Sequence, residues 1–194
     1  MFLIDKSYWE IRKTEKKGKG VFAKKTILKG TIVGDYIGKL IHIKDVDLEK
    51  EKKNLYLMSY SDEYGIYPDL KKPGVHLINH SCSPNCFIHK YKDRTLVFAL
   101  KDIERKEELT IHYLLPPKLN CKNCTHTCYC ESKNCTGSMH LSDKKYKIWQ
   151  SFQKNQKGKV SKKSFKEAFI KPLAEYPKNI PNNYIVKIKS LGLF

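Results

Sequence analysis

Short apolar runs, many of them β-branched or aromatic, recur through the first 115 residues between glycines, prolines and charged turns. Runs of this kind, bounded by turn formers, are typical of strands. The run TLVFAL at 95–100 is the clearest example. The stretch at 46–54 is polar and charged, and we expect a short helix or a loop there. The predicted strands lie at 7–11, 20–23, 31–37, 56–58, 65–67, 95–100 and 109–115.

The apolar spacing changes beyond residue 141 and becomes typical of helices. We expect helices at 144–154, 162–173 and 184–191, separated by Gly158 and by prolines. Each of the first two has an apolar face opposite its lysines. The chain is therefore expected to be mainly β with short helices, and its tail to be a small helical cap on the strand-rich body. The apolar faces consist of Ile148, Trp149 and Phe152, and of Phe165, Ala168 and Phe169.

The chain is strongly basic, with a formal net charge of +18. From residue 141 to the end, thirteen lysines stand against three acidic residues. A lysine-rich solvated surface explains such a charge, and so does contact with DNA, RNA or a nucleosome. No apolar run reaches about 18 residues, so we expect no membrane-spanning helix. The opening residues MFLIDK lack the pattern of a secretory signal, which favours the cytoplasm or the nucleus.

One segment, LINHSCSPNC at 77–86, follows neither a helical nor a strand period. Five of its side chains are polar and need hydrogen-bond partners if they are buried. Each one left unpaired costs roughly 1–3 kcal/mol. Such a segment either lines a site, holds a metal, or forms an exposed polar loop. The seven cysteines fall into two groups, 82–86 and 121–135, and without an export signal this clustering favours metal over disulfides.

Five motifs in the same order resemble those of SET-domain protein-lysine methyltransferases that carry a post-SET zinc motif. The sequence NHSCSPN at 79–85 looks like the family's NHSCxPN signature. Together the motifs span about residues 8–140. The other four are GKGVFA at 18–23, similar to a GxGxFA cofactor loop; DYIG at 35–38, similar to EYxG; ELTIHY at 108–113, similar to ELTxxY; and CYC at 128–130 with CTG at 135–137, similar to CxC-x4-CxG.

The resemblance implies a SET-domain, β-clip-like fold of small sheets, with a pseudoknot where segment 79–85 crosses the strand end near Tyr113. It divides the chain into a SET domain at 1–116, a zinc-bound post-SET segment at 117–141 and a Lys-rich helical extension at 142–194. The implied catalytic residues are Tyr113, which orients the amine, and Tyr36 in the lysine channel beside Ile111. The implied cosubstrate is S-adenosyl-L-methionine, bound by Gly18, Lys19, Gly20, Val21, Phe22, Asn79, His80, Met139 and Leu141.

The second cofactor that the resemblance implies is zinc. Zinc prefers four tetrahedral nitrogen or sulfur ligands, and cysteine thiolates are among them. By resemblance, its ligands are Cys82, Cys128, Cys130 and Cys135. The remaining thiols, Cys86, Cys121 and Cys124, have no place in that pattern. Cys121 and Cys124 have CxxC metal spacing with His126 nearby, so spare thiols, alternative ligands and a second zinc site all stay open.

Two positions depart from the family pattern. Ile111 stands where a phenylalanine or tyrosine is usual, and a residue without a ring or hydroxyl there predicts that the enzyme can add two or three methyl groups. His112 stands where aspartate is usual, and the sequence gives no interpretation of it. His80 invites a general-base role, but the family is not thought to use it so.

The implied activity is methyl transfer to a lysine of a histone or histone-like protein, with ribosomal proteins as an alternative substrate. A basic enzyme should repel a basic peptide, so either acidic residues line the groove or the extension contacts the nucleic acid that carries the substrate. We expect the nucleus or cytoplasm, or a host cell's nucleus if the source is an intracellular microbe. A catalytically silent SET-like binding module and a zinc-dependent nucleic-acid binder are the competing hypotheses. The acidic candidates are Asp45, Asp47, Glu49, Glu51, Asp62, Glu63 and Asp69.

Overall fold

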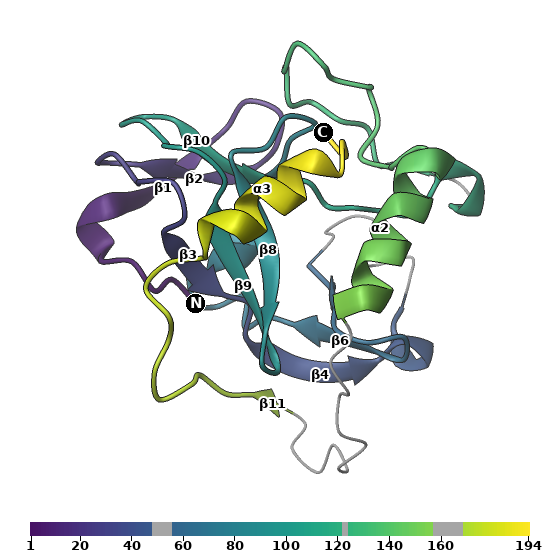
Figure 1. The fold of residues 1–194 in the computed structure, drawn as a ribbon, viewed down its shortest axis with the longest axis horizontal. Coiled ribbons are helices and arrows are strands. Elements are labelled where there is room, and N and C mark those ends of the chain that lie inside the picture. The colour runs from purple at the N-terminus through teal and green to yellow at the C-terminus, as the bar shows by residue number, and fades with distance from the viewer. Residues whose placement is uncertain (48–55, 122–123, 157–168) are drawn as a thin grey trace.

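A computed structural model describes residues 1–47, 56–121, 124–156 and 169–194 as three small sheets with two α-helices (Figure 1). The first sheet has the strand order β1-β2-β10-β7, the second β11-β4-β6-β5, and the third β3-β9-β8. The expected mainly β fold with short helices is confirmed. The strands are β1 Trp9–Lys13, β2 Lys19–Ala23, β3 Ile32–Asp35, β4 Gly38–His42, β5 Met58–Ser59, β6 Tyr64–Tyr67, β7 Asn79–His80, β8 Cys86–Tyr91, β9 Arg94–Ala99, β10 Glu108–Ile111 and β11 Phe169–Ile170.

The helices are α2 Asp143–Gln156 and α3 Asn182–Ser190, which agree with two of the expected helices. Single 3-10 turns, η1 Lys6–Tyr8, η2 Ile43–Asp45, η3 Val75–Leu77 and η4 Lys118–Asn120, link other elements. The helix expected at 162–173 is wrong where it can be tested, because Phe169 and Ile170 form a strand that pairs with β4. The rest of that prediction, with Phe165 and Ala168, lies outside the described residues, as does most of 46–54.

The strand β9 separates two hydrophobic cores. Its side chains alternate between its two faces, as the period of a strand requires. Val97 and Ala99 pack into the core shared with β2, β6 and β10, whereas Leu96 and Phe98 pack into a core shared with the helices. All four side chains are fully buried. Burial on both faces explains why this run is apolar throughout.

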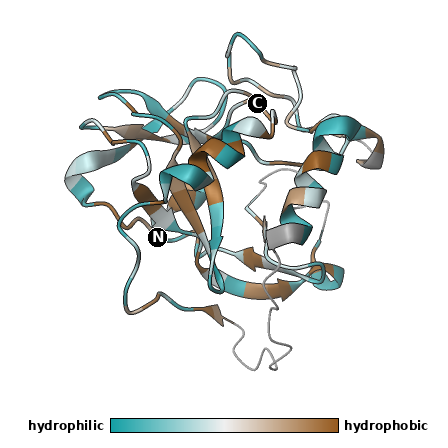
Figure 2. Ribbon diagram, viewed as in Figure 1, coloured by the Kyte–Doolittle hydropathy of each residue, from teal (hydrophilic) through white to brown (hydrophobic). Residues whose placement is uncertain are grey.

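The helical tail packs on the strand-rich body through this second core. Trp149 and Phe152 of α2 are buried there, and the ring of Trp149 meets Phe87 of β8 edge-on at 5.7 Å between centroids. Ile185 and Ile188 of α3 are fully buried in the same core. Figure 2 shows apolar and polar residues alternating along α3, which crosses the strands β8 and β9. Neither described helix is long and apolar enough to cross a membrane.

A buried asparagine holds the crossing between the segment after β7 and the strand β10. The side chain of Asn85 donates to the carbonyl oxygen of Glu108 at 2.8 Å and accepts from the amide of Thr110 at 2.8 Å. Just before it, the strands β7 and β10 run parallel, with Asn79 beside Thr110 and His80 beside Ile111. The amide of Ser81 extends this pairing to the carbonyl oxygen of Ile111 at 2.9 Å. Two distant motifs are thereby fixed side by side.

The Asn85→Ala variant tests this crossing. Removing the side chain leaves a buried carbonyl and a buried amide without partners, so we expect a loss of about 2–5 kcal/mol in the free energy of unfolding. Chemical denaturation of the variant and the parent chain measures the difference. Asn182→Ala, at an exposed position, is the matched control and should change stability little. Equal stability of Asn85→Ala and Asn182→Ala would show that the crossing does not depend on this side chain.

Candidate functional site

A cavity of about 410 Å³ opens between the glycine loop, the start of β7 and the cysteine-rich segment. Its lining contains six of the residues expected to bind the cofactor or act in catalysis, although they are as far apart in sequence as residues 18 and 139. A volume of this size is typical of small-molecule sites, which usually measure about 300–1,000 Å³. The six are Gly18, Lys19, Asn79, His80, Tyr113 and Met139.

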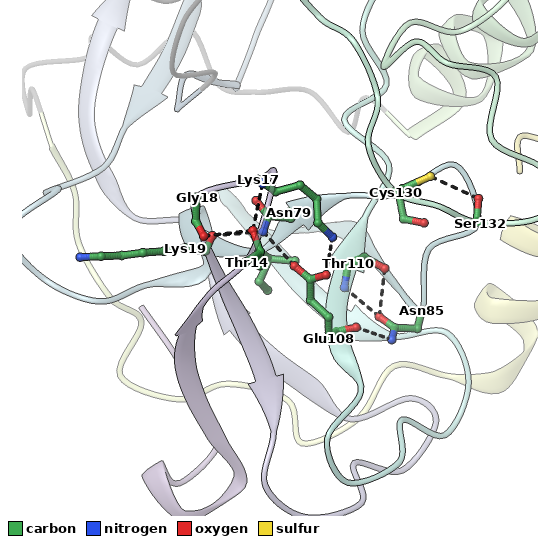
Figure 3. Close-up of polar contacts among 12 residues, drawn as sticks. Thr14, Lys17, Gly18, Lys19, Asn79, Asn85, Glu108, Thr110, Cys130 and Ser132 are labelled. Carbon is green, nitrogen blue, oxygen red and sulfur yellow. Dashed lines mark hydrogen bonds and ion pairs between the residues drawn. The ribbon is translucent and has the colours of Figure 1, made fainter.

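A chain of polar contacts fixes Asn79 at the wall of this cavity (Figure 3). Its amide nitrogen donates to the carbonyl oxygen of Lys19 at 3.1 Å and to the Glu108 carboxylate at 2.8 Å. The other carboxylate oxygen of Glu108 forms an ion pair with Lys17, and both side chains are less than one fifth exposed. Because both donors of the amide are engaged, the carbonyl oxygen of Asn79 is oriented away from these partners and can accept from a ligand.

The absence of a side chain at Gly20 leaves room for the same contacts. A Cβ at this position would lie 2.5 Å from the carboxylate oxygen of Glu108 and 2.9 Å from the amide nitrogen of Asn79. At distances this short, a side chain at position 20 would displace the Glu108 carboxylate and the Asn79 amide from their hydrogen bond. Gly20 therefore supports the wall of the cavity without lining it.

A second cavity, of about 240 Å³, lies on the other side of Tyr113. Tyr36 and Ile111, the two residues expected in the lysine channel, line it together with Tyr113, the other expected catalytic residue. Tyr113 and His76 line both this cavity and the larger one. The remaining lining is largely apolar and includes Leu57, Met58, Val75, Ile78 and Ile88.

Tyr113 is held at this meeting point by its backbone and its hydroxyl. It lies two residues beyond the end of β10, so the strand expected at 109–115 is shorter than predicted. Its amide donates to Nδ1 of His80 at 3.2 Å, and its hydroxyl donates to the carbonyl oxygen of Ile78 at 3.3 Å. Burial raises the pKa of the Tyr113 hydroxyl well above its ordinary value, and Tyr56 and Glu108 add to the effect. The hydroxyl therefore stays neutral near pH 7.

Tyr36 reaches the smaller cavity from the segment after β3. It is 4% exposed, and its hydroxyl donates to the carbonyl oxygen of Tyr56 at 2.5 Å. Backbone pairing of Tyr36 with Thr95, at 2.9 Å, fixes the start of this segment to β9. Tyr36 is therefore a rigid part of the cavity wall.

His80 is neutral in this environment. Burial, followed by the neighbouring His112 and Lys17, lowers the pKa of its imidazole to about 3. Because Nδ1 accepts from the amide of Tyr113, the proton sits on Nε2, which lies 3.6 Å from the sulfur of Cys82. This arrangement makes His80 a positioning group. His112, at the position that the sequence left without interpretation, is also buried, and its Nδ1 accepts from the amide of Leu114 at 3.0 Å.

Besides Gly20, three residues expected to bind the cofactor do not line the larger cavity. Val21 is fully buried in the first core, because neighbouring side chains of a strand point to opposite faces. Phe22 packs under the guanidinium of Arg12, 5.1 Å from the ring centroid. Leu141 is buried in the second core, where its amide pairs with the carbonyl oxygen of Leu115. Side-chain contact of these three with a ligand in the cavity is therefore not supported.

The sulfur atoms of Cys82, Cys128, Cys130 and Cys135 gather within 4.8 Å of one another, as the resemblance implied. The sulfurs of Cys82 and Cys128 are 3.7 Å apart, close to the separation of about 3.8 Å expected for two thiolates on a tetrahedral zinc. The amides of Cys82 and Gly137 point at the sulfurs of Cys130 and Cys135, each at 3.4 Å. Four sulfur donors with amide support fit Zn²⁺.

A second group, Cys121, Cys124, His126 and His140, places its ligand atoms within 4.8 Å of one another. His140 had not been associated with the CxxC pair in the sequence, since fourteen positions separate it from His126. Cys86 belongs to neither group among the described residues and is fully buried on β8.

Several residues of the site cannot be identified from the sequence, because the sequence around them carries little chemical signal. Lys17 precedes the glycine loop in a basic run, and Glu108 opens the ELTIHY segment. The only clue to Glu108 was its place in a recognised motif. Tyr56, His76, Thr125 and Thr127 line the larger cavity and come from segments that no motif covers.

The model of the SET domain family matches residues 18–114 of the chain. Histone-lysine N-methyltransferase NSD3 of Mus musculus is 31% identical over 177 residues, which are 86% of this chain and 12% of that protein. The variant-silencing SET domain-containing protein of Plasmodium falciparum is 34% identical over 151 residues, 70% of this chain and 6% of that protein. The chain thus spans about an eighth of the length of these relatives, or less.

A solved structure has a similar fold. The crystal structure of KRYPTONITE in complex with mCHG DNA and SAH superposes with a TM-score of 0.57 and 29% identity. The likeness covers 68% of this chain and 28% of that one.

Gly20→Ala tests the polar network around Asn79. The new methyl group displaces the Glu108 carboxylate, so we expect a loss of about 1–3 kcal/mol in the free energy of unfolding. Repeating the substitution in a Glu108→Ala background removes the clashing atom, and the cost of Gly20→Ala should fall there. A double-mutant cycle from denaturation curves measures this coupling. If the two costs simply add, Glu108 is not what excludes a side chain at position 20.

Proposed function

The chain belongs to the SET domain family, and we propose that it transfers a methyl group from S-adenosyl-L-methionine to the side-chain amine of a protein lysine. The observation that carries the proposal is the position of Tyr113, which lines two cavities of different size and character. A cosubstrate in one cavity and a lysine in the other would meet beside its hydroxyl. In-line approach of two bound reactants is the main requirement of such a transfer.

We assign the larger cavity to the cosubstrate, whose sulfonium supplies the methyl group. The backbone of Gly18 and Lys19 would accept the amino-acid end, since a glycine lets a ligand approach the main chain closely. Asn79 is oriented to accept a hydrogen bond there. Met139 offers an apolar surface to the adenine, and His80 lies beside it. KRYPTONITE, which has a similar fold, was solved with SAH, and this supports the assignment.

We assign the smaller cavity to the target lysine. Its apolar lining suits an alkyl chain and excludes water, which would compete as a nucleophile. The lysine must be neutral to react, and both desolvation and a nearby positive charge lower the pKa of an amine. Tyr113 remains protonated because its pKa is raised, so it orients the amine rather than removing its proton. Tyr36 supports the opposite wall.

We propose that Cys82, Cys128, Cys130 and Cys135 hold one Zn²⁺. The segment 117–141, which we propose as a post-SET unit between a SET domain at 1–116 and an extension at 142–194, has few apolar residues. Metal binding contributes folding free energy that such a segment lacks. Through Cys82 the metal would join it to the crossing that carries Asn79.

Histones or histone-like proteins are the substrates we favour, because the relatives named above include a histone-lysine methyltransferase. This choice places the activity on chromatin in a nucleus. The net charge of +18 supports contact of the basic extension with the nucleic acid that carries the substrate. Among the acidic candidates for the groove, Asp45, Asp47, Asp62, Glu63 and Asp69 are exposed, and Glu49 and Glu51 lie outside the described residues.

Tyr113→Phe tests the activity. The variant loses only the hydroxyl that orients the amine, so we expect kcat to fall roughly 100-fold or more, with cosubstrate affinity nearly unchanged. Transfer of labelled methyl from S-adenosylmethionine to histones, nucleosomes and ribosomal proteins measures the rate. Tyr184→Phe, which removes the hydroxyl of a partly buried tyrosine on α3, is the control and should keep full activity. A parent chain that binds the cosubstrate but methylates none of these proteins would instead support a silent binding module.

Product analysis tests the role of Ile111, which is 4% exposed at the end of β10. Its aliphatic side chain leaves room for a methylated amine, so we expect di- or trimethyl-lysine to accumulate. In Ile111→Tyr the ring fills that space, and the product should shift toward monomethyl-lysine. Mass spectrometry of the products at long times gives the distribution. Monomethyl-lysine alone from the parent chain at high enzyme concentration would contradict this role.

A further inference from the structure

We propose that Cys121, Cys124, His126 and His140 bind a second zinc ion, separate from the one held by the four cysteines. The two groups share no ligand. Two thiolates and two imidazoles form one of the common structural zinc sites. The CxxC pair and His126 come from one short segment, and His140 approaches from the chain that leaves the cysteine-rich segment.

The distances between the four ligand atoms fit a tetrahedron around zinc. With Zn–S of about 2.3 Å and Zn–N of about 2.0–2.1 Å, tetrahedral geometry places a sulfur and a nitrogen about 3.6 Å apart and two nitrogens about 3.3 Å apart. The sulfur of Cys124 lies 3.7 Å from Nδ1 of His126 and 3.2 Å from Nε2 of His140. The sulfur of Cys121 lies 3.5 Å from Nδ1 of His126, and the two imidazole nitrogens are 3.1 Å apart.

The backbone holds both histidines in this arrangement. Nδ1 of His140 forms a short hydrogen bond with the carbonyl oxygen of Pro116, so this nitrogen carries the proton and Nε2 presents its lone pair to the cluster. Such a bond on the far nitrogen is the usual support of a metal-bound histidine. The amide of Met139 donates to the carbonyl oxygen of His126 at 3.0 Å, and His140 pairs in parallel with Leu115. His126 is 8% exposed.

The proposed ion would brace one wall of the larger cavity. Thr125 lies between two of the ligands and Met139 is adjacent to a third, and both residues line that cavity. Thr127, also in the lining, pairs with Ser138 across the same loop. The zinc proposed for the four cysteines would fix Cys128 and Cys82 on the neighbouring side. Two ions would therefore clamp the segment at both ends of the stretch that faces the cavity.

Zinc content of the purified chain tests the site independently of any activity. We expect two zinc ions per parent chain by elemental analysis, one in Cys124→Ser/His140→Gln, and two in the single variant His140→Cys, which keeps a zinc ligand. Cys86→Ala, which alters a cysteine outside both groups, is the control and should retain two. One zinc per parent chain would overturn the proposal and leave a hydrogen-bonded Cys/His cluster in its place.

X-ray absorption at the zinc edge gives a second measurement that needs no variant. Two ions on the two groups have six sulfur and two nitrogen ligands, so the average ion should show three sulfurs and one imidazole. An average shell of four sulfurs would overturn the assignment.

The bracing role rests on the proposed function and needs a separate measurement. We expect the Kd of S-adenosylhomocysteine to rise roughly 10-fold or more in the one-zinc variant, by calorimetry, because supporting groups of metal sites have effects of this size. An unchanged Kd with one zinc would overturn the bracing role, whereas two ions in an inactive parent chain would contradict only the proposed activity.

Discussion

The arrangement of the site depends on one buried crossing between segment 79–85 and the strand β10. The segment pairs with β10 at Asn79 and His80 and is bonded to it again by the side chain of Asn85. A parallel pair of two-residue strands contributes little by itself, and a buried polar segment is costly unless each group finds a partner. Asn85 resolves this problem, since its amide satisfies a carbonyl and an amide of β10 within a buried environment. The crossing brings Asn79 and Tyr113 to the same cavity, although 34 positions separate them in the sequence.

The two cavities that Tyr113 lines differ in charge and polarity. Lys17 and Asn79 line the larger cavity, and Glu108 behind them joins the two in one hydrogen-bonded chain. The smaller cavity is bordered largely by apolar side chains. A polar pocket suits a charged small molecule, and an apolar channel suits an alkyl amine that must lose its proton and its water. Tyr113 is partly buried and lines both cavities, and its hydroxyl stays neutral because its pKa is raised.

The cysteine-rich segment and the helical tail reach the body by different means. The helices α2 and α3 bury aromatic and aliphatic side chains against Phe87 and Phe98, so ordinary hydrophobic burial attaches them. The segment 117–141 has few apolar side chains to bury, and its thiols Cys128, Cys130 and Cys135 gather with Cys82 of the body. The tail also contacts the end of β3, where the hydroxyl of Tyr176 donates to the buried carboxylate of Asp35 at 2.7 Å. Asp35 is the residue that replaces glutamate in the DYIG motif, so the extension stabilises a motif of the body.

The sequence alone determined the features that local pattern and motif order can specify: the strand-rich body, the helices α2 and α3, and the four-cysteine group. It also singled out Asn79 and Tyr113 as candidates, and both line the larger cavity. Tertiary structure decided the rest, because it depends on contacts between distant positions that carry no mutual signal. Phe169 and Ile170 are spaced for a helix, yet pairing with β4 makes them a strand. Val21 and Leu141 lie in or near recognised motifs, but their side chains are buried in the two hydrophobic cores and do not line the larger cavity. His140 joins the CxxC pair because the chain returns beside Leu115 and Pro116, and only that return brings a histidine fourteen positions beyond His126 into the cluster.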